Sequence, residues 1–165
     1  MRLLVASDSH GNTDTLRRIV APQGAAQGTP CGAAQPSAAA LLFLGDGARD
    51  AEAVLAATPD APPLFAVRGN NDFGVDWPLS RLEIFGDKRI FMTHGHAYAV
   101  KRGADALLAA ARGARADVVL FGHTHASYKG YEDGLYICNP GYARRGEYAV
   151  LDITKAGVVC LLRKL

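Results

Sequence analysis

Five short apolar runs in this chain each end just before residues that can bind a metal ion. The runs cover residues 3–5, 41–44, 64–67, 90–92 and 118–121, and the junctions that follow are Asp8-Ser9-His10, Gly45-Asp46, Gly69-Asn70-Asn71-Asp72, His94-Gly95-His96 and Gly122-His123-Thr124-His125. All five histidines of the chain lie in these junctions. Such runs predict strands buried on both faces, and an open α/β sheet binds ligands beyond the carboxyl ends of its strands. We therefore expect the polar side chains to converge at one site.

The spacing inside the junctions favours the same site. Asp8/His10, Asn70/Asp72, His94/His96 and His123/His125 are all pairs two residues apart. In extended backbone such side chains point to the same side, so we expect two ligands to reach a site from one turn. One pair alone is more often solvated than metal-bound, whereas several pairs at strand ends indicate a metal centre.

Size and charge limit the remaining possibilities. A chain of 165 residues suits one domain, spanning residues 1–165, that buries its own core. Its 18 basic and 16 acidic side chains give a formal charge of +2, which gives no strong signal for duplex nucleic acid or a membrane surface. The first predicted strand starts at Arg2 and no apolar stretch is long enough to span a membrane, so we expect a cytoplasmic protein. Cys31, Cys138 and Cys160 lack disulfide or zinc-knuckle spacing, which predicts a loop thiol and two small strand hydrophobes.

Alternating strands and helices predict crossover units in the first half of the chain. Helices are expected from about 13 to 22, 50 to 57 and 102 to 112, and antiparallel strands near 128–131, 135–138, 147–153 and 158–163. The segment 23–40 is rich in Gly, Ala, Pro and Gln without an apolar period, so we interpret it as a surface insertion. Together these patterns predict an α/β protein with two packed sheets flanked by helices.

The ordered motifs Asp-x-His, Gly-Asp, Gly-Asn-x-Asp, His-Gly-His and Gly-His-x-His resemble those of the calcineurin-like metallophosphoesterases. The short chain is similar to the small bacterial YfcE-like phosphodiesterase branch of that family. The resemblance extends from Leu3 to about Gly141 and implies a four-layer α/β/β/α sandwich with two mixed sheets. It also implies a hydrolytic centre of two divalent metal ions.

By matching positions, the resemblance implies one metal held by Asp8, His10 and His125, a second held by Asn70, His94 and His123, and Asp46 bridging both. Two such cations can share a water, lower its pKa and clamp a phosphoryl group. Simpler roles are open at several positions. Asp8 or Asp46 could cap the following helix, Asn70 could form an Asx-turn, Asp50 is expected to cap a helix, and Asp72 to accept hydrogen bonds within its loop.

Two positions bear on the leaving group. Many members of the family have a histidine thought to protonate the leaving oxygen after the metal-binding Asn, whereas this chain has Asn71, which cannot act as an acid. His96 is the one histidine without a ligand assignment, and it is a candidate either for that acid or for a hydrogen-bonding partner of the ligands. A serine is usual in the family where Tyr142 follows Asn139-Pro140-Gly141. Asn12 is expected to cap the first helix.

The sequence therefore predicts a phosphodiesterase that uses a metal-bound hydroxide on a small phosphodiester substrate. The nitrogen and oxygen ligands suit Mn, with Ni, Zn, Fe or Mg as further candidates. A homo-oligomer is left open. The alternatives are a phosphomonoesterase and a non-catalytic protein-binding scaffold of the same fold, as in the vacuolar sorting subunit of retromer. A nuclease is disfavoured because residues 73–89 are too few for a DNA-binding cap.

Overall fold

The computed structural model describes residues 1–21 and 37–165, which form a pair of five-stranded sheets that face one another. The first sheet has the order β10-β9-β1-β2-β3 and contains β1 (Arg2–Ala6), β2 (Ala40–Phe43), β3 (Leu64–Ala66), β9 (Glu147–Thr154) and β10 (Gly157–Lys164). The second has the order β4-β5-β6-β8-β7 and contains β4 (Ser80–Phe85), β5 (Lys88–Thr93), β6 (Val118–Leu120), β7 (Tyr128–Glu132) and β8 (Leu135–Asn139). Both sheets are mixed: β1, β2 and β3 are parallel, as are β5, β6 and β8, and the remaining pairings are antiparallel.

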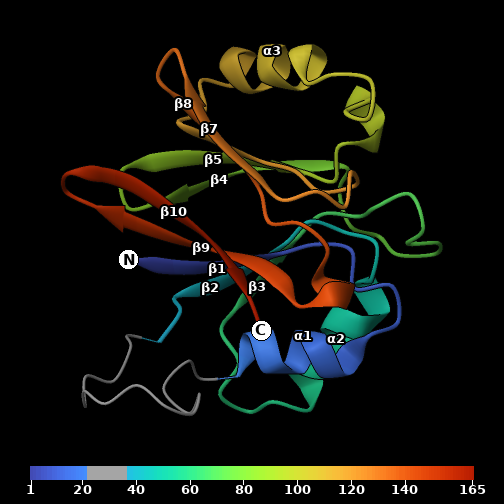
Figure 1. Cartoon of the computed structure of the whole chain (residues 1–165). Helices are drawn as coiled ribbons and strands as arrows, with labels where there is room; N and C mark the ends of the chain where they lie inside the picture. The colour runs from blue at the N-terminus through green and yellow to red at the C-terminus, as the bar shows by residue number, and fades with distance from the viewer. Residues whose placement is uncertain (22–36) are drawn as a thin grey trace.

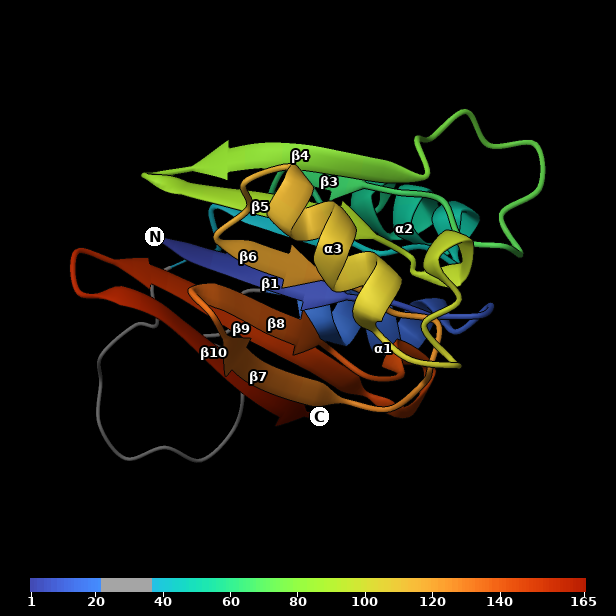
Figure 2. The same ribbon diagram turned by 90° about the horizontal axis from the view of Figure 1, so that it is seen from above.

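Helices cover the outer face of each sheet and complete the predicted four-layer α/β/β/α sandwich (Figure 1). Helices α1 (Thr13–Val20) and α2 (Ala48–Ala56) pack on the first sheet, and α3 (Asp105–Gly113) packs on the second. Seen from above, α3 lies over the second sheet, near β6 and β8 (Figure 2). Two 3-10 turns, η1 (His96–Tyr98) and η2 (Ala143–Arg145), follow β5 and β8.

The continuous apolar runs are explained by strands with two buried faces. In β1, Leu3 and Val5 point between the sheets, whereas Leu4 and Ala6 point toward the helix layer. Side chains of a strand alternate between its faces, so a strand buried on both sides needs apolar residues at every position. The prediction is thus confirmed for the runs in β1, β2, β5 and β6, whereas β3, at the edge of its sheet, is half-buried at Leu64 and Phe65. The carboxyl ends of all five strands meet at one edge of the sandwich.

Some local predictions need correction. Strand β4 was not predicted, although Arg81, Leu82, Glu83 and Ile84 alternate polar and apolar residues as an edge strand does. Most of the predicted insertion 23–40, with its loop thiol, lies outside the described residues, and Ala40 already belongs to β2.

The other two cysteines are strand residues, as predicted. Cys138 lies in β8 and Cys160 in β10, and their Sγ atoms are 3.0 Å apart across the space between the sheets. Both remain thiols. No helix among the described residues is long and apolar enough to cross a membrane.

Candidate metal centre

The loops after β1 and β6 bring together the first group of candidate ligands. Asp8 and His10 follow β1, and His125 follows β6 of the opposite sheet. His125 Nε2 lies 3.2 Å and His10 Nε2 3.6 Å from Asp8 Oδ1, and the two imidazole nitrogens are 3.3 Å apart. Metal–ligand bonds of the usual length place ligand atoms about 2.8–3.6 Å from one another in tetrahedral or octahedral geometry. The three atoms therefore have the spacing of ligands around one cation.

A second group lies beside the first. Asp46 follows β2, His94 follows β5 and His123 follows β6. His94 Nε2 lies 3.4 Å from Asp46 Oδ2 and 3.1 Å from His123 Nδ1. The same Asp46 oxygen is 3.7 Å from His10 Nε2, so this carboxylate lies between the two groups. Each group combines residues from both sheets, which places the centre where the two sheets meet.

Asp8 has the surroundings of a ligand whose metal-facing atom is left free. Its Oδ2 accepts hydrogen bonds from the Ser7 hydroxyl at 2.6 Å and from the His123 backbone N–H at 3.0 Å. Its Oδ1 is buried without a hydrogen-bond partner and faces His10 and His125. A buried carboxylate oxygen without a partner is costly. A cation bound by the first group would satisfy it.

His94 is oriented in the same way. Its Nδ1–H donates to the backbone carbonyl of Leu44 at 2.7 Å, so Nε2 is the ring nitrogen that faces Asp46 and is placed to bind a metal. Burial lowers the pKa of His94, but its hydrogen bond to Asp46 and the charge of Asp8 outweigh burial and raise it. Burial and the neighbouring His94 lower the pKa of His123 to about 4, so His123 is a neutral imidazole at neutral pH.

Asp46 stays ionised for a physical reason. Burial favours its neutral form, but hydrogen bonds from His94 and from Asn71 outweigh this and hold its pKa well below the usual range. The Asn71 backbone N–H donates to Oδ1 at 2.8 Å and its side-chain Nδ2 donates to Oδ2 at 2.6 Å. A charged carboxylate between the two groups suits a shared pair of cations.

Two further residues that the motifs single out are Asn70 and His96. Asn70 and Asn71 are both exposed, and the side chain of Asn71 reaches Asp46. The ring of His96 lies 5.4 Å from that of His94 and 6.1 Å from that of His123, outside both groups. Its Nδ1 is buried without a partner, and burial and the nearby His94 lower its pKa.

Asp72 supports the centre through the backbone, as predicted for a hydrogen-bond acceptor in this loop. Its Oδ1 accepts from the N–H groups of Gly47 and Ala48, and its Oδ2 accepts from those of Asp46 and Gly69, each at 2.8 Å. It thereby satisfies amides at the start of α2 and joins the loops after β2 and β3.

The cap predicted at Asp50 was wrong. Gly47 is the N-cap of α2, and the Asp50 carboxylate instead accepts from Ser9 Oγ at 2.6 Å and Gly11 N at 2.8 Å, which ties α2 to the first loop. The predicted cap at Asn12 is confirmed, because its side chain accepts from the backbone N–H of Thr15.

The geometric reason given for the paired ligands was also wrong. Asp8, His10, Asp46, His123 and His125 all have φ between 43° and 66°. This is left-handed backbone, which non-glycine residues adopt rarely and mostly at functional sites, rather than the extended backbone assumed from the spacing. The pairs reach the site because the loops turn sharply there.

Close backbone packing explains two of the motif glycines. A Cβ on Gly45 would collide with the backbone of Gly69, and a Cβ on Gly122 would collide with Ser7 Oγ. Asn139, buried in β8, donates to Gly122 O at 3.1 Å and to Thr124 Oγ1 at 3.0 Å. The loop that carries the last two histidines is therefore held between β1 and β8.

Tyr142, absent from the ligand prediction, covers the first group. Its ring stacks on His125 with centroids 4.2 Å apart and an interplanar angle of 3°, and it meets His10 edge-on at 5.8 Å. The guanidinium of Arg145 lies 5.4 Å from the centroid of the Tyr142 ring. Only its place after Asn-Pro-Gly could have drawn attention to Tyr142 in the sequence.

Comparisons with known proteins agree with this geometry. Residues 1–156 match the model of the calcineurin-like phosphoesterase superfamily domain. The chain is 30% identical to the probable metallophosphoesterase YsnB of Bacillus subtilis over 93% of this chain and 85% of that protein. It is 27% identical to the phosphodiesterase YfcE of Escherichia coli K12 over 98% and 92% of the two chains.

Solved structures share the fold. A conserved protein of Streptococcus pneumoniae, described as a predicted phosphoesterase, superposes with a TM-score of 0.70 at 21% identity, covering 98% of this chain and 97% of that one. Vps29 of Chaetomium thermophilum superposes with a TM-score of 0.69 at 18% identity, covering 99% and 96%. The family match, the relatives and the two ligand groups lead to one conclusion: the chain belongs to the calcineurin-like phosphoesterase superfamily.

Proposed function

We propose that this protein is a phosphodiesterase with a centre for two divalent cations. The observation that carries the proposal is the position of Asp46, whose Oδ2 lies 3.4 Å from His94 in one ligand group and 3.7 Å from His10 in the other. A carboxylate in this position could contact a cation in each group. Asp8, His10 and His125 would hold the first cation, and Asn70, His94 and His123 the second.

Two cations, when bound, supply Lewis acidity and lower the pKa of a shared water. The protein supplies orientation and charge. Asp8 and Asp46 offset the positive charge, and the Leu44 carbonyl fixes the tautomer of His94. Tyr142 limits rotation of the exposed His125 ring by stacking on it. The nitrogen and oxygen donors suit Mn, Ni, Zn or Fe, and Mg is a further candidate.

Asn71 supports a diester rather than a monoester as substrate. An asparagine cannot give a proton to a poor leaving group, and here its side chain is engaged with Asp46. A diester with a good leaving group needs little such help, whereas an alkyl monoester depends on it. The name of the relative YfcE supports the same preference. His96 is the candidate for a substitute acid.

A protein-binding scaffold is the second candidate, because Vps29 proteins share this fold. A likeness at this level of identity concerns the fold alone. The two candidates differ in one respect that can be measured: a scaffold needs no turnover with any divalent cation. The complete ligand groups and the unpaired Asp8 oxygen favour the enzyme.

The test is hydrolysis of an aryl phosphodiester with Mn or Ni added, and again with a chelator. We expect turnover that depends on the cation, and loss of most of it in Asp46→Asn together with lower metal content by elemental analysis. Asp76→Asn, an exposed carboxylate in a neighbouring loop, is the matched control and should retain both. A folded wild-type protein that shows no turnover with any divalent cation would favour the scaffold. An Asp46→Asn variant with two bound metals and normal rates would exclude the bridge.

A further inference from the structure

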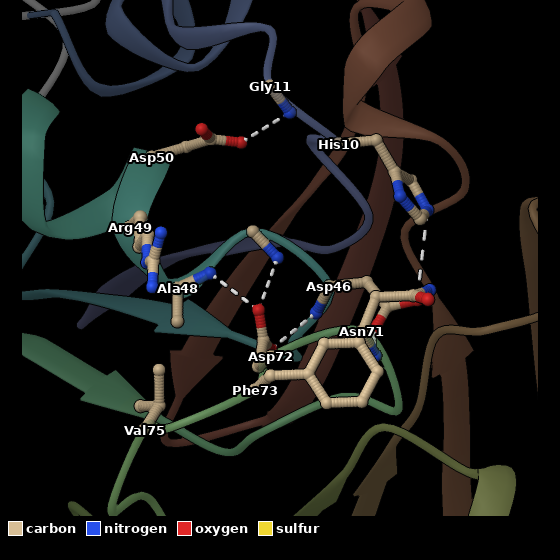
Figure 3. A pocket seen from close by; sticks show the side chains of 11 residues that line it. His10, Gly11, Asp46, Ala48, Arg49, Asp50, Asn71, Asp72, Phe73 and Val75 are labelled. Atoms are coloured by element: carbon tan, nitrogen blue, oxygen red, sulfur yellow. Dashed lines mark hydrogen bonds and ion pairs between the residues drawn. The ribbon is translucent and has the colours of Figure 1, made fainter.

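A pocket of about 270 Å³ adjoins the metal centre and extends beyond the candidate ligands. In Figure 3, His10 and Asp46 lie on one side of the pocket and Arg49 and Val75 on the other, with the ring of Phe73 between them in this view. Of these residues, only His10 and Asp46 belong to the ligand groups. The far wall therefore contains none of the candidate metal ligands and is free to contact a substrate.

Phe73 is the most exposed large apolar side chain among the described residues, with 77% of its surface accessible. No aromatic ring within residues 1–21 and 37–165 stacks on it. A phenyl ring left in water beside a polar centre can bury its face against a flat ligand, and stacking of a base on an aromatic side chain is worth about a 5- to 150-fold change in affinity. Val75, half-buried, extends the apolar portion of the wall.

Arg49 supplies the charge on this wall. It is exposed, and none of the described residues forms an ion pair with it. The nearby carboxylates are already engaged: Asp50 accepts from Ser9 and Gly11, and Asp72 accepts from four backbone amides. A guanidinium without an internal partner offers a planar set of donors that suits phosphate oxygens.

We propose that this pocket is a subsite for the aromatic substituent of the phosphate-ester substrate, with Phe73 stacking on the ring and Arg49 pairing with a phosphate oxygen. This rests on the proposed function, in which the metal ligands hold the phosphoryl group. The volume is slightly below the range of about 300–1000 Å³ for drug-sized ligands, so the pocket suits one ring-bearing group rather than a polymer. A nucleoside phosphate and a simple aryl phosphate share this chemistry.

Calorimetric titration of the full chain with Mn present tests the subsite without requiring turnover. The ligands are adenosine 5′-monophosphate, phenyl phosphate and ribose 5-phosphate, which carry the same phosphate on different groups. We expect the aromatic ligands to bind about 5- to 150-fold more tightly than ribose 5-phosphate, the range for stacking on one aromatic side chain. The tighter of the two identifies the substituent as nucleoside or simple aryl.

Variants assign the preference to residues. Phe73→Ala should abolish the aromatic preference while leaving the affinity for ribose 5-phosphate unchanged, and Phe73→Leu should do the same because leucine has no aromatic face. Ile84→Ala, a truncation at another exposed apolar position on β4, is the matched control and should keep the preference. Arg49→Gln should weaken all three ligands by about 10-fold or more, the effect of one charge-assisted hydrogen bond.

The subsite is excluded if the three ligands bind equally, if none binds at millimolar concentration, or if Phe73→Ala keeps the preference. Hydrolysis of an aryl diester, measured on the same preparation, separates failure of the subsite from failure of the proposed phosphodiesterase activity. Turnover without an aromatic preference excludes the subsite and leaves the phosphodiesterase. An aromatic preference that depends on Phe73, without turnover, supports the subsite as a binding site and excludes the enzyme.

Discussion

Replacement of Asp72 by asparagine tests how the loops of the metal centre are held. The Asp72 carboxylate accepts four backbone N–H groups, two on each oxygen, from the loops after β2 and β3. An amide has one acceptor oxygen, and its NH₂ group would face the other two donors. In either orientation of the amide, Asp72→Asn therefore loses two of the four charge-assisted hydrogen bonds.

The expected loss of stability follows from the two lost hydrogen bonds. Hydrogen bonds to a charged group contribute about 1.5–3 kcal/mol each, so two of them amount to about 3–6 kcal/mol. Asp72 is half-buried, and water can replace some of what is lost. We expect the free energy of unfolding to fall by about 2–4 kcal/mol. Because the Asp46 backbone N–H is one of the four donors, we also expect metal affinity to fall by about 10- to 100-fold, as for other residues that orient metal ligands.

Urea unfolding in the presence of a chelator measures the loss of stability separately from metal binding. Titration of the folded variant with Mn measures the loss of metal affinity. Asp76→Asn makes the same change of charge in the same loop, at an exposed carboxylate, and should shift the free energy of unfolding by less than about 0.5 kcal/mol. If Asp72→Asn is as stable as wild type, or no less stable than Asp76→Asn, the four hydrogen bonds do not hold this loop.

Three further predictions concern individual side chains. Tyr142→Ser should weaken metal binding by about 2- to 12-fold, the usual contribution of an aromatic pair. Tyr142→Phe keeps the stack on His125 and should bind metal as wild type does. Equal metal affinities of Tyr142→Ser and wild type in a competition titration would exclude this role. Asn71→His should raise the hydrolysis of an alkyl monoester relative to an aryl diester by supplying a general acid, and an unchanged ratio would mean that position 71 does not face the leaving group. Hydrogen bonds from Arg2 lower the pKa of Asp152, so this pair stabilises the fold above the ordinary carboxyl pKa and loses its contribution as the pH falls below about 4. Asp152→Asn should therefore lower the free energy of unfolding by up to about 1 kcal/mol at pH 7 and by less at pH 3, and an equal loss at both values would contradict the assignment.

The sequence determined where the ligands would gather. Each run from Leu3–Val5 to Val118–Phe121 is short, apolar at every position and followed by turn residues, which is the pattern of a strand covered on both faces. Parallel neighbours in a sheet end at the same edge, so the residues after such strands must meet there. The strand interiors and the region of the site could therefore be predicted before any coordinates were known.

The sequence could not determine the orientation of each side chain at that edge. The left-handed φ angles of Asp8 and His123 depend on contacts between loops far apart in the chain, such as the hydrogen bond from the His123 N–H to Asp8. The same holds for the side chain of Asn71, which reaches Asp46 from the loop after another strand.

Tertiary packing also decided which unremarkable residues would support the site. Tyr142 stacks on a candidate ligand and Asp72 joins two loops, although neither role has a local pattern. Local patterns report on burial and backbone propensity, which act over a few residues. The direction of a side chain at the end of a strand is set by which other segments pack against its loop, and that depends on the whole fold.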